Sequence, residues 1–234
     1  MNHEKQSRDR KGAGQKIPLS YFITLTCYGT WLHGDQNGSV DSEQNTYNTP
    51  FKPGNLTLKR ISRKRMKQDP YQMNHPRRRI LKQTILDVCE NRDWLLLALH
   101  VRKEHLHAVL HAKTSSERVW NDFKSYGSRR LNKNGYDHEK RKRWTRGGSG
   151  IFLWETDQVQ SAIRYTLHRQ GKPMQRFLHP DISAHEFREY DHKNDITLRE
   201  FFQSHGILDS SGQIVQTKER TIELRAHKEN REEN

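Results

Sequence analysis

A short run near the middle of the chain, EHLHAVLHA, carries three histidines that could bind a metal ion. If the run is a β-strand, its two-residue period puts His105, His107 and His111 on one face and the apolar residues between them on the other. Two imidazoles at positions i and i+2 lie side by side and could share one cation, with a third ligand from elsewhere. The chain has 14 histidines, so the spacing alone is also compatible with a solvent-facing strand that carries histidines by chance.

A tyrosine in the run TDQVQSAIRYTLHRQ is the second residue that could do chemistry. The run predicts a helix that is capped by Thr156 and ends at Gly171 and Pro173. Tyr165 falls roughly 120° from the centre of the apolar side of an ideal helical wheel, which suits contact with solvent or substrate. That apolar side consists of Val159, Ala162, Ile163 and Thr166. A phenol with a pKa of about 10 attacks phosphate poorly, but a divalent cation on the phosphate oxygens would neutralise charge and orient the phosphorus for in-line attack.

The elements that must position these residues follow from hydrophobic periodicity. Ile23, Leu25 and Cys27 alternate with polar residues, as in a strand. The order that follows is a helix from Pro76, two strands joined by a hairpin at Lys103, a helix opened by a serine cap, a short strand and the tyrosine helix. These later elements fall at 76–94, 95–102, 104–112, 115–133, 151–155 and 156–170. The order predicts an α+β fold, a ferredoxin-like antiparallel sheet with helices on one face and the tyrosine-bearing helix by the active site, plus basic extensions.

The same pass along the chain divides it into three parts. Residues 1–16 are expected to be a disordered basic N-terminus. Residues 17–175 would form the domain that carries the site, with a basic insertion at about 33–75. Residues 176–234 would be a C-terminal extension, partly helical, with a charged tail.

The positive charge of the chain is gathered into two blocks. The net charge is +14, and residues 51–80 hold ten lysines and arginines against one acid, while residues 122–148 hold nine against three. Clustered charge predicts a nucleic-acid surface better than general solubility does. Trp144 and Tyr126 could stack unpaired bases there or simply pack. The candidate DNA-binding residues are Arg77, Arg78, Arg79, Lys124, Arg129, Arg130, Lys140, Arg141, Lys142 and Arg143.

Two cysteines cannot build a disulfide framework or a zinc knuckle, and this predicts a reduced, intracellular protein. The N-terminal residues have no apolar run that would suit a secretory signal, and no stretch of the sequence is long and apolar enough for a membrane span. We therefore expect a cytoplasmic, nucleoid-associated protein with no membrane partner.

Three motifs in order, YGTWLHGD, EHLHAVLHA and LWETDQVQSAIRYTLHRQGKPM, resemble the single-tyrosine HUH transposases, in particular the REP-associated tyrosine transposases. The resemblance covers roughly residues 20–175. It implies a metal-dependent single-strand DNA endonuclease and strand transferase that cleaves and rejoins hairpin DNA. By resemblance, Tyr165 attacks the DNA and forms a 5′-phosphotyrosine link, and His105 and His107 hold Mg²⁺ or Mn²⁺.

The third metal ligand is open between two residues. Insertion-sequence relatives often place a glutamine four residues after the tyrosine, but Arg169 stands there in this chain. On an ideal helix His168 lies about 60° and Gln170 about 140° from Tyr165, so His168 is slightly preferred. A distorted last helical turn would reverse that order.

Several readings of the sequence remain open. The chain could be a resident enzyme, a mobile insertion-sequence transposase with the same chemistry, or a nucleic-acid-binding protein of this fold with little or no catalytic activity. A zinc hydrolase using His105, His107 and His111 would leave Tyr165 without a role. A monomer with an internal site and a homodimer that exchanges tyrosines are both compatible with the sequence.

Overall fold

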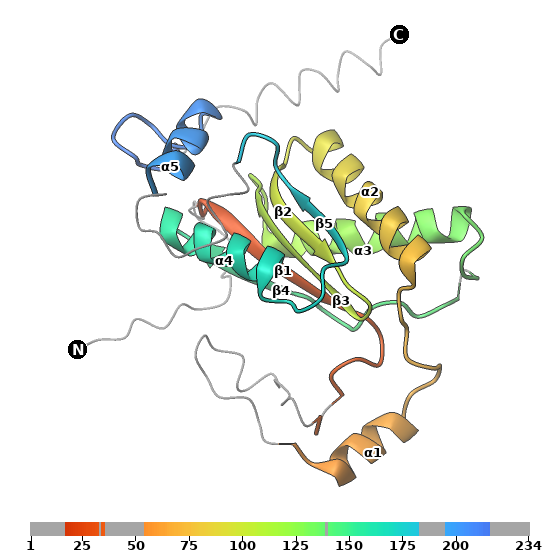
Figure 1. Ribbon diagram of the computed structural model, residues 1–234. Helices are drawn as coiled ribbons and strands as arrows, with labels where there is room; N and C mark the ends of the chain where they lie inside the picture. Colours follow the sequence, from red (N-terminus) through yellow and green to blue (C-terminus); the bar gives the residue numbers. More distant parts are fainter. Residues whose placement is uncertain (1–16, 33, 36–53, 139, 183–194, 216–234) are drawn as a thin grey trace.

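The computed structural model describes residues 17–32, 34–35, 54–138, 140–182 and 195–215. These residues form a five-stranded antiparallel sheet in the order β4-β1-β3-β2-β5 (Figure 1). The strands are β1 (Ser20–Thr26), β2 (Leu95–Val101), β3 (His105–His111), β4 (Ser149–Leu153) and β5 (Gln175–Leu178). The helices are α1 (Leu56–Lys64), α2 (His75–Asn91), α3 (Ser116–Lys133), α4 (Thr156–His168) and α5 (Asp195–Ser204).

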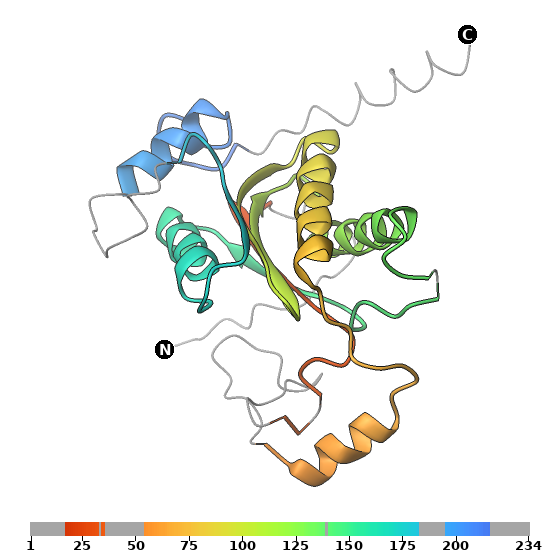
Figure 2. The same ribbon diagram turned by 45° about the vertical axis from the view of Figure 1, so that its right-hand side comes forward.

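The segment from β1 to β4 confirms the predicted ferredoxin-like α+β fold. It runs β1, α2, β2, β3, α3, β4, with the additional helix α1 between β1 and α2, and its four strands lie in the order β4-β1-β3-β2. Helices α2 and α3 cover one face of the sheet, and α4 covers the other (Figures 1 and 2). The sheet therefore separates two hydrophobic cores. Side chains of β3 point alternately into the two: Leu106 and Leu110 belong to the core under α2 and α3, the first core, and Val109 belongs to the core under α4, the second core.

Capping residues mark the first turns of α2, α3 and α4, and the cap of α4 differs from the predicted one. Asn74 and Ser115 accept hydrogen bonds from the backbone N–H groups three residues on and cap α2 and α3. For α4 the expected cap at Thr156 is wrong, because Thr156 is the first helical residue. The cap is Glu155, which exchanges hydrogen bonds with Gln158 in a capping box.

Two elements beyond the tyrosine helix were not individually predicted. Strand β5 pairs with β2 and widens the sheet, although only four residues take part. Helix α5 places Leu198, Phe201 and Phe202 in the same core as the apolar side of α4. The expected disordered stretch 1–16 lies outside the described residues, as does much of the insertion. None of the described helices is long and apolar enough to cross a membrane.

Candidate active site

Two predicted ligands, His105 and His107, lie side by side on the face of β3 that α4 covers. Their ring centroids are 4.9 Å apart. In the β1–β3 register Thr24 is opposite His107, and its Oγ1 lies 2.9 Å from His107 Nδ1. This hydrogen bond orients the imidazole and leaves Nε2 for another partner. A hydrogen-bonded second ring nitrogen is the usual support of a metal-binding histidine.

Both imidazoles are held in the neutral form by their surroundings. Burial lowers the pKa of His107 to about 3, and the neighbouring His105 and His100 act in the same direction. Burial is also the main cause that lowers the pKa of His105. A neutral imidazole has a free lone pair, so the pair can bind a cation at neutral pH without first losing a proton.

The third group at the histidine pair is Gln170. Its Oε1 lies 3.3 Å from His105 Nε2, and its side chain also interacts with His107. The structure thus places Gln170, and not the preferred His168, beside the histidine pair. The reason is the early end of α4: His168 is its last residue, solvent-exposed, and Arg169 leaves helical geometry at φ −99° and ψ 19°. The ideal wheel does not apply past that point, and Gln170 turns back to the sheet.

Tyr165 lies beside the same pair. Its ring centroid is 5.4 Å from that of His107 and 5.8 Å from that of Phe22, with an edge-on arrangement in both cases. The ring is 42% exposed, while the apolar side of α4 is buried, as the helical wheel predicts. Among the described residues, no hydrogen-bond partner of the Tyr165 hydroxyl is found. The phenol is thus held by its ring, and its oxygen is available for reaction.

Two aromatic side chains that were not predicted to belong to the site pack against the histidines. Phe22 stacks on His107 with centroids 5.2 Å apart, and Trp31 leans on His105 at 5.3 Å. Phe22 precedes Thr24 by two residues, so strand alternation could have placed it on this face. Nothing in the pattern could have placed Trp31, which is 45% exposed and has a φ of +50°. A bulky residue in that conformation is uncommon and often marks a functional position.

His100 was also missed, and it ties the tyrosine helix to the sheet. It is fully buried on β2 opposite His107. Its Nδ1 lies 2.9 Å from the carbonyl oxygen of Thr166, and its Nε2 lies 3.2 Å from the backbone nitrogen of Met174. A carbonyl needs a donor and an N–H needs an acceptor, so the ring must be neutral with its proton on Nδ1. Burial lowers its pKa to about 4.

The third histidine of the strand does not join the site. His111 is buried, and its Nδ1 lies 2.9 Å from the carbonyl oxygen of Leu19. It is four residues beyond His107, roughly 13 Å along a strand. The zinc-hydrolase reading, which needed His105, His107 and His111 around one ion, is therefore wrong.

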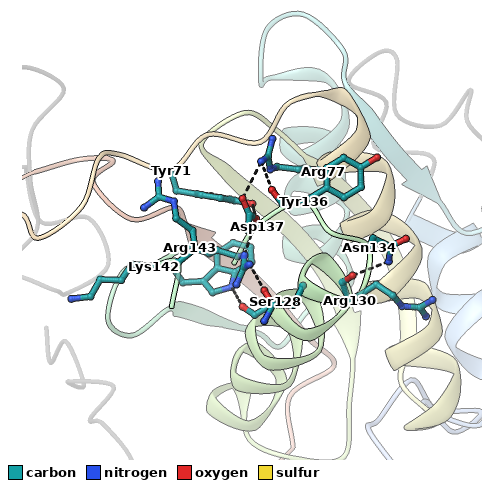
Figure 3. Close-up of polar contacts among 12 residues, drawn as sticks. Tyr71, Arg77, Ser128, Arg130, Asn134, Tyr136, Asp137, Lys142 and Arg143 are labelled. Atoms are coloured by element: carbon teal, nitrogen blue, oxygen red, sulfur yellow. Dashed lines mark hydrogen bonds and ion pairs between the residues drawn. The ribbon is translucent and has the colours of Figure 1, made fainter. Parts of the chain in front are cut away.

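Three of the predicted DNA-binding residues make contacts within the fold, and Figure 3 shows two of them, Arg77 and Arg143. Arg143 is only 3% exposed and pairs with Asp137 at 3.0 Å, and Arg77 pairs with the other oxygen of that carboxylate at 3.0 Å. Hydrogen bonds from Tyr71 and the two arginines lower the pKa of Asp137 against the opposing effect of burial. Lys124 donates to the carbonyl of Thr145, 2.9 Å away, and to that of Gly147. Charge counting could not distinguish such inward cations from exposed ones.

Of the other predicted DNA-binding residues, five are exposed, and Arg78 and Arg141 are half-buried. Arg79, Lys140 and Lys142 are exposed, and Arg129 lies over the ring of the exposed Tyr126. Partial pairing is seen for Arg130 with Asp87, for Arg78 with the carbonyl of Met73, and for Arg141 with the carbonyls of Asp69 and Pro70.

Of the two aromatic residues predicted to stack on bases or to pack, Trp144 packs within the protein. Its indole N–H donates to Ser128 Oγ at 3.1 Å, and its ring packs against the first core. Tyr126, 39% exposed, retains an accessible face.

The basic loop and the histidine pair share one end of the sheet. The backbone N–H of Tyr28, just after β1, donates to the carbonyl of Arg143, while Thr26 is paired with His105. Arg141 and Lys142 therefore lie near the strand ends from which His105 projects. On the other side, Arg102 donates to the carbonyl of Lys172, and its charge contributes to the lowered pKa of His105.

One comparison with known protein families agrees with the motifs. Residues 61–165 match the family model described as "Transposase IS200 like". Among curated proteins no match was found. A solved structure described as "Structure of the REP associates tyrosine transposase bound to a REP hairpin" is 12% identical, with a TM-score of 0.38 over 69% of this chain and 72% of that chain. The resemblance expected from the motifs is thus confirmed: the segment of the chain that carries the histidine pair and ends at Tyr165 is similar to the IS200-like transposases.

Proposed function

We propose that the chain is a metal-dependent single-strand DNA endonuclease and strand transferase that cleaves and rejoins DNA at hairpin sites. The observation that carries the proposal is the placement of Tyr165 against His107, in one site with His105 and Gln170. The family match over residues 61–165 supports a transposase. The hairpin substrate is an inference from the resemblance to the REP-associated enzymes.

The donor set fits a divalent cation. Two neutral imidazoles on β3 lie beside the amide oxygen of Gln170, which follows α4. The hydroxyl of Thr24 orients one of these imidazoles, that of His107. Nitrogen and oxygen donors of this kind suit Mn²⁺, and the oxygen of Gln170 also suits Mg²⁺. When bound, such an ion supplies charge neutralisation on the phosphate oxygens of the DNA.

Tyr165 would then perform the transfer itself. Its hydroxyl oxygen forms a bond to the scissile phosphorus as it loses its proton, and the bond from phosphorus to the 3′ oxygen breaks. That oxygen takes up a proton and leaves as a free 3′-OH, while the 5′ end stays linked to the tyrosine. A second 3′-OH can attack the phosphotyrosine and restore the phenol, so rejoining needs no nucleotide cofactor.

The proposed site is complete within one chain. The histidine pair, Gln170 and Tyr165 all come from the same molecule, with adjoining rings. We therefore favour an internal site, in which Tyr165 serves the histidines of its own chain.

The deciding experiment uses labelled single-stranded hairpin DNA with Mn²⁺ or Mg²⁺ and detects the covalent protein–DNA adduct on a denaturing gel. We expect an adduct with the unmodified chain, none with Tyr165→Phe, and an unchanged level with Tyr136→Phe, a matched control on another part of the surface. Cleavage that persists in Tyr165→Phe would overturn the mechanism. Hairpin binding without cleavage by the unmodified chain would favour the DNA-binding protein with little or no activity.

A further inference from the structure

A second group of metal-binding side chains lies away from the candidate active site, where β5 ends and α5 ends. His179 follows β5 directly, Asp181 comes two residues later, and His205 follows the last residue of α5. Each offers one ligand atom, and these atoms all lie within 4.8 Å of one another. Figures 1 and 2 show the chain leaving β5 next to α5.

We propose that His179, Asp181 and His205 form a second metal site, for a borderline divalent ion of the Zn²⁺ class, which fastens α5 to the end of the sheet. Two imidazole nitrogens and one carboxylate oxygen are a common three-residue zinc set, with water in the fourth position. This donor set favours Zn²⁺, Co²⁺ or Ni²⁺ over Mg²⁺ and Ca²⁺. Nothing in the proposed DNA chemistry uses these residues.

The surroundings of His205 prepare it for this role. Its Nδ1 lies 2.8 Å from the carbonyl oxygen of Phe201, which makes that nitrogen the donor and leaves the Nε2 lone pair free. A ligating histidine typically donates its other N–H to a backbone carbonyl in this way. The ring also packs on Phe201, with centroids 4.3 Å apart, which limits its rotation.

His179 is fixed from the sheet side. Its backbone N–H donates to the carbonyl of Leu97 on β2, and its ring lies 5.7 Å from that of His205 and 5.2 Å from that of Phe201. Asp181 has an exposed side chain with an oxygen 3.8 Å from His179 Nδ1, so it can rotate toward an ion without disturbing the core.

Such a metal site would indirectly stabilise α4, the helix that carries Tyr165. Helix α5 supplies Phe201 and Phe202 to the core under α4, and a bound ion would hold α5 to the strand next to that core. Metal binding to the folded chain alone raises its stability by mass action. Zinc should therefore raise the melting temperature even where the active-site histidines are absent.

The test measures Zn²⁺ binding by calorimetry and by thermal unfolding, using the full chain. His105→Ala/His107→Ala removes the candidate active site and is the background. In this background we expect one bound Zn²⁺ and a higher Tm with zinc. Adding His205→Ala or Asp181→Asn should weaken zinc binding at least tenfold and abolish the rise in Tm, and adding His138→Ala, an exposed histidine elsewhere, should change neither.

Two results would overturn the proposal: no zinc binding by the background variant, or binding that neither His205→Ala nor Asp181→Asn weakens. Asp181→Asn preserves the shape of an exposed side chain and so tests the site without risk to the fold. If the background variant does not fold, Asp181→Asn can be made in the unmodified chain instead. There it should lower the number of bound Zn²⁺ ions from two, one in each site, to one. These readouts do not depend on DNA cleavage, so the failure of one proposal leaves the other standing.

Discussion

The ring of Tyr165 on α4 meets the ring of His107 on β3 at 70°, with 5.4 Å between their centroids, although the two residues are 58 positions apart in the sequence. The contact leaves the phenol oxygen at the edge of the site while the imidazole stays buried. Under the proposed function, this arrangement would put the attacking oxygen next to the metal ligands, and such positioning favours phosphoryl transfer.

Gln170, rather than His168, should govern the metal dependence of cleavage. Its amide oxygen contacts His105, whereas His168 is exposed at the last residue of α4. We expect Gln170→Ala to raise the Mn²⁺ concentration needed for half-maximal cleavage by about tenfold or more, the scale seen when a metal-site group is lost. His168→Ala is the matched control and should leave that concentration within about twofold of the unmodified value. The reverse ranking would return the third-ligand role to His168.

Thr24 should act as a positioning residue for the metal site. Thr24→Val keeps the shape of the side chain but removes the 2.9 Å contact with His107 Nδ1. Loss of such a partner typically weakens metal binding about 10–100-fold. Thr24→Ser, which restores the hydroxyl, should recover most of the affinity in a Mn²⁺ titration followed by calorimetry. Equal affinities for the Val and Ser variants would show that the hydroxyl has no such role.

His100 should make the metal-free protein sensitive to acid. Burial lowers its pKa to about 4, below the 6.5 of an ordinary histidine, so the unfolded chain binds this proton more tightly than the folded chain does. The contribution of His100 is complete above pH 6.5 and is lost as the pH falls toward 4, by about 1.4 kcal/mol per pH unit. Chemical denaturation with chelator present should show this slope, and His100→Asn should flatten it, because the amide cannot be protonated there. Other buried histidines contribute too, so the difference between the two proteins is the quantity to compare.

The basic residues should separate into two classes when they are replaced. Arg143→Ala leaves Asp137 with Arg77 and Tyr71 as its remaining partners and also removes a hydrogen bond to Asn132, so the free energy of unfolding should fall by about 1.5–3 kcal/mol. The exposed Arg79→Ala should change it by less than about 0.5 kcal/mol. If Arg79 contacts phosphate, its loss should weaken hairpin binding at all sequences and reduce the salt slope by about one. Denaturant titrations and binding curves at several salt concentrations measure both effects.

The fold was largely predictable because its elements obey short-range rules. The alternation of β3 and the apolar stripe of α4 fix which faces are buried, and both agree with the structure. The site was predictable only where side chains follow those periods, as His105, His107 and Tyr165 do. Gln170 lies past the end of a helix, where the period fails, and its position depends on the backbone angles of Arg169.

The remaining differences from the sequence-based predictions involve residues whose partners are distant in the sequence. Arg143 and Arg77 read as surface charges until the fold brings Asp137 between them. His100 lies in a run of apolar residues, and its partners are the carbonyl of Thr166 and the N–H of Met174, 66 and 74 residues away in sequence. No pattern within a window of the sequence carries such information.

The core beneath α4 depends on residues that follow the family match. Leu198, Phe201 and Phe202 pack with Val159 and Ile163, although the matched segment ends at Tyr165. The packing beneath the helix that carries Tyr165 therefore depends on a part of the chain outside the matched segment. Under the proposed function, substitutions in α5 would change how firmly Tyr165 is held without altering the histidines or the tyrosine itself.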